Sequence, residues 1–290
     1  MGKLMNLKIL FFLILPLFLY SQEKKSEKIL AFNSSLGKMM KYQNSGSALK
    51  NWIKKVTFNN KTYISLKIFN DNNKMLDNYF KKQIDILVIT PFDYVNNLDK
   101  FKNVTNEFWY MKKDMKYNFH KKYLIVKNSI NSLDDLKNKK IAINSANKIA
   151  KMFLEKKYLE KNKKSAKKIL ENIEFIPNSS ILLKTYFGAY DAAIVDSYEY
   201  DTMLELNPSI VKKIKILEES PRIFNNMIIA FSNDSNMENY KVLLKDFLIS
   251  KDKMEVFNLL KIQTIVSDSN NMSNLEKYYS DYINLKKAYD

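Results

Sequence analysis

A short polar turn at residues 144–147 offers the clearest binding chemistry in the sequence. It follows a run of strand type at residues 140–143 and precedes a helical pattern of apolar residues that continues to Leu159. A turn of this kind presents free backbone N–H groups and the positive end of the helix dipole to an anion. Ser145, Asn147 and Lys148 add a hydroxyl, an amide and a positive charge at the same place. The sequence therefore predicts an anion-binding site at the start of this helix.

Further polar residues stand at the ends of other predicted strands or at the starts of other predicted helices. Ligands of open α/β sheets bind beyond the carboxyl ends of the strands, where such residues gather. The competing interpretation for those at helix starts is that they only cap the helix, because Ser, Asn and Asp are preferred there. The full set of predicted ligand-binding residues is Ser34, Thr90, Tyr94, Ser145, Asn147, Lys148, Ser179, Ser180 and Asp196.

The charge of the chain is strongly positive. Its 290 residues include 48 Lys and Arg against 31 Asp and Glu, which gives a formal net charge of +17. Arg222 is the only arginine, whereas nucleic-acid-binding proteins rely on Arg, which forks onto phosphates and bases. Lysine with abundant Asn and Ile indicates the bias of an AT-rich genome, and a long-range attraction of anionic partners is the alternative. We expect no nucleic-acid partner.

Catalytic and metal-binding residue types are scarce. Cysteine is absent, which excludes disulfides, cysteine zinc sites, cysteine nucleophiles and a lipid anchor on an N-terminal cysteine. The single histidine, His120, stands beside Lys121 and Lys122 at the start of a predicted strand. One histidine argues against a histidine-built metal site and against a Ser-His triad. We therefore expect no catalytic residue, no metal and no cofactor.

The first 22 residues have the pattern of a secretory signal peptide. Lys3 and Lys8 give a basic start, and an apolar run follows at residues 9–20. The run is short for a membrane span and contains Pro16, and we expect cleavage after Ser21. The alternative is an uncleaved N-terminal anchor. In both cases the remainder of the chain is exported.

Strands and helices alternate after this segment, which predicts right-handed βαβ units. Strands are predicted at residues 27–33, 62–69, 85–90, 106–111, 122–127, 140–143, 172–176, 191–195, 211–217 and 226–231, and helices at 36–55, 73–82, 135–139, 149–159, 179–188, 196–205, 237–249, 252–260 and 272–288. Pro91 suits the first turn of a further helix, and Gly188 suits a helix C-cap.

The two βα series indicate an α/β protein with two lobes around a cleft. After the signal peptide at residues 1–21, we expect residues 22–120 to begin the first lobe and residues 121–225 to form the second. Residues 226–290 would return to the first lobe and add the C-terminal helices.

The order of these segments resembles a known family. SLDDLKNKKIAIN, IEFIPNSSILLKTYFGAYDAAIVDSYEYDTM and ILEESPRIFNNMIIAFSND resemble segments of the periplasmic substrate-binding proteins of phosphate, phosphite and phosphonate ABC importers. DILVITPFDYV resembles the strand and turn in the first lobe of that family. The resemblance covers roughly residues 27–265. It implies a type 2 periplasmic-binding fold, with two α/β lobes, a two-strand hinge and a ligand cleft between the lobes.

The ligand clasp is where this chain departs from the family it resembles. The family has a Ser-Thr-Ser triplet, often followed by Gly, where this chain has Asn147, Lys148, Ile149 and Ala150. In the family the hydroxyl and N–H groups of the triplet clasp phosphonate oxygens, whereas the side chain of Ile149 cannot donate. Lys148 could supply a point charge instead. A Gly-Ser-His turn of the family appears here as Asn-Ser-Ser at residues 178–180, and by the resemblance an acidic residue near Asp196 can meet a ligand amine.

The resemblance implies a monomeric, non-enzymatic protein of the periplasm. It would close its lobes over a small, anionic, phosphonate- or phosphate-like ligand and deliver that ligand to an ABC permease. The alternative is a sensing module whose closed form is read by a membrane receptor kinase or a cyclic-dinucleotide enzyme. An enzyme is the weaker hypothesis, because the sequence offers no nucleophile–base pair and no metal cluster.

Overall fold

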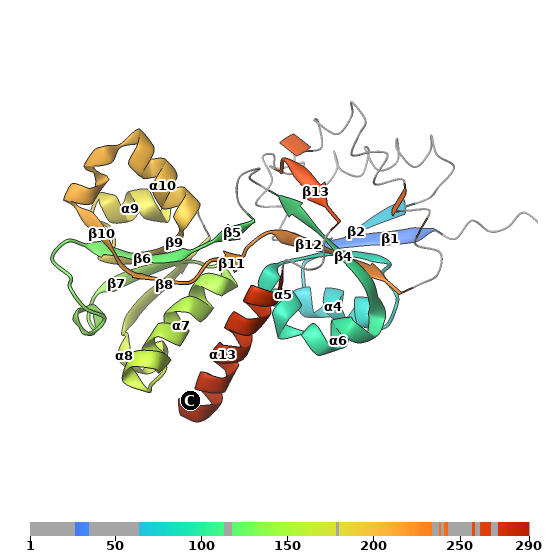
Figure 1. The fold of residues 1–290 in the computed structure, drawn as a ribbon, viewed down its shortest axis with the longest axis horizontal. Coiled ribbons are helices and arrows are strands. Elements are labelled where there is room, and N and C mark those ends of the chain that lie inside the picture. Colours follow the sequence, from blue (N-terminus) through green and yellow to red (C-terminus); the bar gives the residue numbers. More distant parts are fainter. Residues whose placement is uncertain are drawn as a thin grey trace, which may run out of the picture.

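Two β-sheets stand toward opposite ends of the long axis of the molecule, one in each lobe (Figure 1). The computed structural model describes residues 27–34, 64–112, 118–177, 180–233, 238, 241–242, 257–258, 262–267 and 272–289. The expected signal peptide and the helices predicted at residues 36–55, 237–249 and 252–260 lie wholly or almost wholly outside these ranges. The two-lobed α/β architecture expected from the sequence is confirmed.

The sheet of the first lobe has six strands in the order β13–β4–β12–β3–β1–β2. β1 pairs in parallel with β2 and β3, whereas the pairs β12–β3, β12–β4 and β13–β4 are antiparallel. The strand bounds are β1 Lys28–Asn33, β2 Ile64–Phe69, β3 Ile86–Ile89, β4 Thr105–Lys112, β12 Met227–Ser232 and β13 Thr264–Val266.

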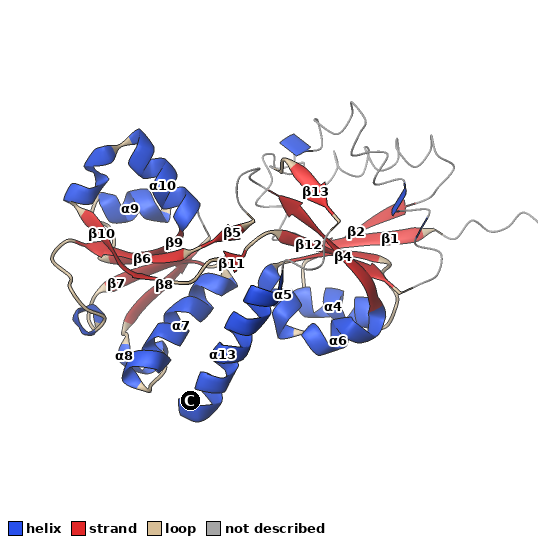
Figure 2. Cartoon of the chain, in the orientation of Figure 1, coloured by secondary structure: helices blue, strands red, loops and turns tan. Residues whose placement is uncertain are grey.

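Helices cover one face of this sheet (Figure 2). They are α4 (Asn72–Phe80), α5 (Pro91–Asn96) and α6 (Leu98–Val104). Side chains of a strand alternate between the two faces of its sheet. Accordingly, Leu87 and Ile89 of β3 lie in the apolar cluster on the helix side, and Ile86 and Val88 lie in a second cluster on the opposite side. Both faces of β3 are buried, as its continuous apolar sequence predicts.

The sheet of the second lobe has five strands in the order β10–β6–β9–β7–β8. Their bounds are β6 Lys122–Lys127, β7 Lys140–Asn144, β8 Asn172–Ile176, β9 Ala192–Asp196 and β10 Ile214–Glu219. Figure 2 shows α7 (Lys148–Asn162) and α8 (Ala166–Ile169) on one face and α9 (Ile181–Tyr186) and α10 (Ser197–Leu206) on the other. Ile141 and Ile143 of β7 therefore pack with Phe153 of α7, whereas Ala142 packs with Leu182 of α9.

The junction between the lobes contains a short strand pair and one long helix. β5 (Phe119–His120) pairs with β11 (Ile223–Phe224) where the chain passes between the lobes. Helix α13 (Ser273–Tyr289) runs between the lobes and packs against both α7 and α5 (Figure 1). Ile149 and Met152 of α7 lie in one apolar cluster with Leu275 and Tyr278 of α13. The core is therefore continuous across the junction.

Some local expectations need correction. The helix predicted at residues 135–139 is wrong: a single 3₁₀ turn forms at Asp134–Leu136. The Asp135 carboxylate accepts hydrogen bonds from the backbone N–H groups of Asn131 and Ser132 at 2.8 and 2.9 Å, which favours a turn over a continuing helix.

Two further differences concern the ends of elements. The strand predicted from residue 211 begins at Ile214, because Pro208–Lys212 forms another 3₁₀ helix. β5, β11 and β13 were not predicted, since two or three residues carry no usable periodicity.

Gly188 has φ +86° just beyond α9, as its predicted C-cap role requires. Within the described ranges, no helix is long and apolar enough to cross a bilayer.

Candidate ligand-binding site

The turn between β7 and α7 is built mainly by asparagine side chains. Asn144 Oδ1 accepts from the backbone N–H of Ala146 at 3.0 Å, and Asn147 Oδ1 accepts from that of Ala150 at 3.0 Å. Ser145 donates its own backbone N–H to a carbonyl oxygen of the adjacent strand β8 at 2.9 Å. Asn147 is therefore the N-cap of α7, whereas Ser145 is exposed beside the start of the helix.

An ion pair joins the start of α7 to the first lobe. Lys148 Nζ lies 3.0 Å from Asp93 Oδ1, on α5. The Asp93 carboxylate also accepts from Asn72 Nδ2 at 3.1 Å and from Thr90 Oγ1 at 2.7 Å. The Lys148 ammonium lies 5.4 Å from the ring centroid of Phe92, which is a cation–π distance. Two predicted residues, Thr90 and Lys148, are thus connected through the buried Asp93.

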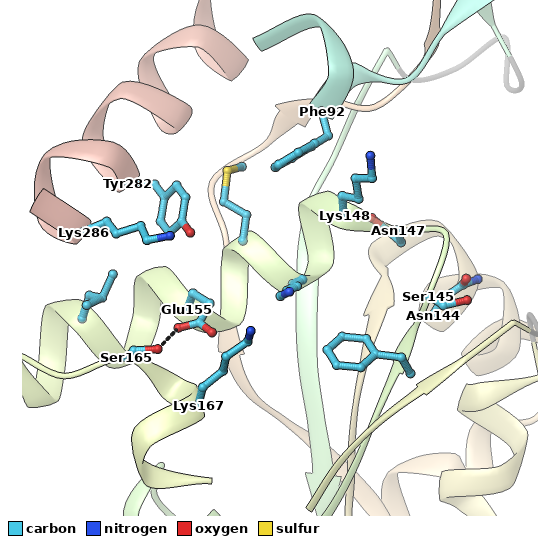
Figure 3. A pocket seen from close by; sticks show the side chains of 14 residues that line it. Phe92, Asn144, Ser145, Asn147, Lys148, Glu155, Ser165, Lys167, Tyr282 and Lys286 are labelled. Atoms are coloured by element: carbon cyan, nitrogen blue, oxygen red, sulfur yellow. Dashed lines mark hydrogen bonds between the residues drawn. The ribbon is translucent and has the colours of Figure 1, made fainter. Parts of the chain in front are cut away.

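A groove of about 540 Å³ runs along one face of α7 (Figure 3). Ser145, Asn147 and Lys148 line its head, and Phe92 of α5 reaches it from the first lobe. Residues of α8 and β8 line the groove together with residues of α13. The groove therefore lies at the junction of the lobes and collects three of the predicted ligand-binding residues.

The charge of this groove is predominantly positive. Its charged lining residues are Lys148, Lys151, Lys167, Lys286 and Glu155. Glu155 is 8% exposed, and its Oε2 accepts from Ser165 Oγ at 2.8 Å and from the backbone N–H of Ala166 at 2.9 Å. One buried carboxylate among four ammonium groups leaves an excess of positive charge, which favours an anionic ligand.

A second polar cluster surrounds Asp196, near the crossing between the lobes. The Lys122 side chain is fully buried, and its Nζ donates to Asp196 Oδ1 and to Asn225 Oδ1, the latter at 3.1 Å. Asn225 Nδ2 in turn donates to Asp196 Oδ2 at 3.2 Å. Asp196 precedes α10, but its side chain makes no capping hydrogen bond. Its carboxylate is instead occupied by Lys122 and Asn225.

Glu199 lies one turn further along, on α10. Burial raises the pKa of its carboxyl to about 7, the negative charge of Asp196 adds to that increase, and the charge of Lys122 opposes it. Two carboxyl groups and one buried ammonium therefore share this region of the second lobe. The pKa of Glu199 lies close to neutral pH, so its charge responds to small changes in pH.

The structure does not bring all predicted residues together. Tyr94 lies in the apolar cluster of the first lobe, 4% exposed, and its hydroxyl donates to Glu276 Oε1 of α13 at 2.6 Å. Burial and the neighbouring Glu276 raise the Tyr94 pKa. Ser34 directly follows β1, and Ser180 directly precedes α9. Neither residue lines the groove. Ser179 lies outside the described residues.

Several lining residues of the groove were not predicted from the sequence. Lys151 lies three residues after Lys148, and Glu155 lies four residues after Lys151, so the helical period alone would have placed them on one face of α7. Lys167, Phe175, Tyr282 and Lys286 come from other elements, and no local signal marks them. Within the described ranges, no group of three or more His, Asp or Glu residues could hold a metal ion.

Comparison with known proteins identifies the group to which this chain is similar. The sequence model of the family described as "ABC transporter, phosphonate, periplasmic substrate-binding protein" matches residues 39–271. No curated protein sequence matches the chain.

Solved structures of low sequence identity share the fold. A binding-protein component of an ABC phosphonate transporter from Pseudomonas aeruginosa has a TM-score of 0.62 at 14% identity, covering 91% of this chain and 90% of that chain. PhnD1 from Prochlorococcus marinus in complex with methylphosphonate has a TM-score of 0.59 at 14% identity, covering 90% and 99%. XAC2383 from Xanthomonas citri bound to ATP has a TM-score of 0.66 at 10% identity, covering 91% and 100%. At these identities the likeness extends to the fold alone.

The hydrogen bond of Tyr94 predicts a structural role for its hydroxyl. Tyr94→Phe removes the bond to Glu276 and should lower the free energy of unfolding by about 1–2 kcal/mol, measured by urea denaturation. Tyr198→Phe is the matched control, because Tyr198 is exposed and should change stability little. An unchanged stability of Tyr94→Phe together with a lost response to ligand would instead assign the hydroxyl to ligand binding.

The raised pKa of Glu199 predicts a loss of stability as the pH rises. The pKa of an exposed Glu is near 4.5, whereas that of Glu199 in the folded protein is about 7. The Glu199 carboxyl therefore keeps its proton to a higher pH in the folded state than in the unfolded state. The stability that this group contributes is present below pH 4.5 and is lost as the pH rises through 7. Glu199→Gln should therefore be more stable than the parent at pH 8, by on the order of 2 kcal/mol, because one pKa unit is worth about 1.4 kcal/mol and partial contact with water reduces the effect.

Urea denaturation at pH 5 and pH 8 measures this difference. Glu205→Gln is the control, since Glu205 is exposed on the same helix. The same change in stability between pH 5 and pH 8 for the parent and Glu199→Gln would contradict the prediction.

Proposed function

This chain belongs to the family of periplasmic substrate-binding proteins of phosphonate ABC transporters, and from that premise we propose that it captures a small anionic solute between its lobes. The solute would be phosphonate- or phosphate-like, and the loaded protein would deliver it to an ABC permease. Members of the family bind a transported solute and are not enzymes. The proposal concerns the ligand, its site and its delivery.

The observation that carries the proposal is the chemistry at the head of the groove. Ser145 offers an exposed hydroxyl there, and Lys148 offers an ammonium group beside the start of α7. α7 has 15 residues, so its N-terminus has the full partial positive charge of a helix dipole. A phosphonate or phosphate oxygen at this point would meet a hydroxyl, an ammonium and the positive end of the helix dipole, which favour an anion.

The position of this head at the lobe junction supports capture by closure. A ligand stabilises the closed state only through contacts that the open state lacks. Phe92 lines the groove from the first lobe, and Ser145 and Lys148 line it from the second. A solute held among them would join the two lobes, which is the general design of hinge closure around a ligand.

Solved proteins of the same fold are consistent with an anionic ligand. One of them is in complex with methylphosphonate and another is bound to ATP. The fold therefore accommodates phosphorus oxyanions that differ greatly in size.

Delivery and export complete the proposal. Residues 1–21 would act as the signal peptide, and the mature protein would work as a monomer in the periplasm. A sensing role, in which a membrane receptor kinase or a cyclic-dinucleotide enzyme reads the closed form, is the second candidate. The replacement of the family triplet by Asn147, Lys148 and Ile149 favours it, because a sensor can recognise a different ligand.

A thermal-shift measurement tests the ligand class and the site together. Methylphosphonate, phosphite or phosphate at about 100 times its dissociation constant should add roughly 2.7 kcal/mol to the stability of the purified protein. Ser145→Ala and Lys148→Gln should each weaken binding of the same anion by roughly 5- to 100-fold, since each removes one hydrogen-bonding partner of a charged ligand.

Two controls separate site effects from general loss of charge. Ser129→Ala and Lys184→Gln remove the same groups from exposed positions elsewhere on the second lobe and should leave the shift unchanged. Because Lys148 also pairs with Asp93, the stability of Lys148→Gln without ligand is measured first. A folded protein that responds to none of the three anions would contradict the proposed ligand class.

A further inference from the structure

The groove is much larger than a single phosphonate or phosphate ion. It extends along α7 from Lys148 to Leu159, which corresponds to roughly 16 Å at about 1.5 Å per residue. Its volume of about 540 Å³ falls in the range of roughly 300–1,000 Å³ that holds drug-sized ligands. An oxyanion bound at the head, beside Ser145 and Lys148, would leave most of this space to another part of the same ligand.

Positive charge continues beyond the head. Lys151 and Lys167 line the groove, and neither forms an ion pair with a carboxylate among the described residues. Lys286 adds a further ammonium group from α13 (Figure 3). A single anionic group at the head would reach Lys148. Lys151 and Lys167, further along the groove, are suited to an additional phosphate group of the same ligand.

An exposed aromatic ring lies beside one of these lysines. Phe175, in β8, is 47% exposed and lines the groove, and Lys151 Nζ lies 5.4 Å from its ring centroid. Phe92 and Tyr282 add aromatic surface from the first lobe and from α13. A half-exposed ring in a basic groove is the arrangement on which planar bases stack, and each such contact is worth about 1–3 kcal/mol.

A carboxylate acceptor distinguishes the ligand from a bare chain of phosphates. Glu155 Oε2 takes hydrogen bonds from Ser165 and Ala166, and neither of these bonds occupies its second oxygen, Oε1. Glu155 lines the groove, and a carboxylate oxygen there repels phosphate but accepts from a hydroxyl or an amine. Inorganic polyphosphate has no such donor, whereas a ribose or a base carries several.

We propose that this groove binds a nucleotide-class ligand. Its planar base would stack on Phe175, its two or more phosphates would contact Lys148, Lys151 and Lys167, and a hydroxyl or amine of the sugar or base would donate a hydrogen bond to Glu155. The inference rests on the proposed function, because it assigns the ligand class of the same solute-binding site. It goes beyond that function in requiring a base and a sugar, which methylphosphonate lacks.

Isothermal titration of the purified protein with ATP, tripolyphosphate and methylphosphonate at one ionic strength tests this inference. ATP should bind at least tenfold more tightly than either of the other probes. Phe175→Ala should weaken ATP binding roughly 5- to 150-fold and leave methylphosphonate binding unchanged. Lys167→Gln should weaken ATP and tripolyphosphate to a similar degree.

Matched controls are available on the second lobe. Phe187 is 74% exposed at the end of α9 and lies outside the groove, so Phe187→Ala should leave ATP binding unchanged, as should Lys184→Gln. Equal affinity for ATP and tripolyphosphate, or an unchanged ATP affinity in folded Phe175→Ala, would overturn the inference.

The outcomes also separate this inference from the proposed function. Binding of methylphosphonate that depends on Ser145, without binding of ATP, would overturn the inference and leave the proposed function standing. Binding of ATP that depends on Phe175, without binding of methylphosphonate, would support the inference and restrict the captured solute to nucleotide-class ligands. Binding of no probe would contradict both.

Discussion

The packing of α13 across both lobes is the contact on which the rest of the arrangement depends. Leu275 and Tyr278 of α13 share one apolar cluster with Ile149 and Met152 of α7. Full burial of such side chains contributes about 1.5–3 kcal/mol each, so this cluster outweighs any single surface ion pair, which contributes about 0–1 kcal/mol. This contact holds α7 in place, and Lys148, Lys151 and Glu155 of the same helix line the groove together with Met152. The site is therefore a consequence of how α7 is packed.

At the proposed site, electrostatics at the junction would couple an anionic ligand to the lobes. The Asp93 carboxylate is buried, and a buried charge is tolerated only when it is paired and hydrogen-bonded. Asn72 and Thr90 supply two of its donors from the first lobe, and Lys148 supplies the third from the second. A ligand anion at the head of α7 would share Lys148 with Asp93. Binding and lobe contact thus draw on the same ammonium group, while Asp93 keeps its two local donors.

The sequence was most informative where a signal is local and repeated. The strands predicted at residues 122–127 and 172–176 have the same bounds as β6 and β8, and residues of the polar turn at 144–147 line the head of the groove. Tyr94 shows the limit of this reasoning. It follows a strand end, as ligand residues do, yet the helix that begins at Pro91 turns its side chain into the core, toward Glu276 in a helix 182 residues further along the chain. No pattern in the sequence records so distant a contact.

The same limit explains why the wider groove was not predicted. Phe175 and Lys286 line the groove only because β8 and α13 are brought to α7 by the fold.

Around Asp196, the resemblance to the family implied a contact with a ligand amine. Here the fully buried ammonium of Lys122 already occupies that carboxylate, and Asn225 bonds its second oxygen. A ligand amine would have to compete with an ammonium that has no access to water, and taking the carboxylate away would leave that buried charge unpaired at a large energetic cost. The carboxylate of Asp196 is thus paired with an ammonium group of the protein itself. Lys151 and Lys167 in the groove have no such carboxylate partner among the described residues, so a net attraction for anions remains there.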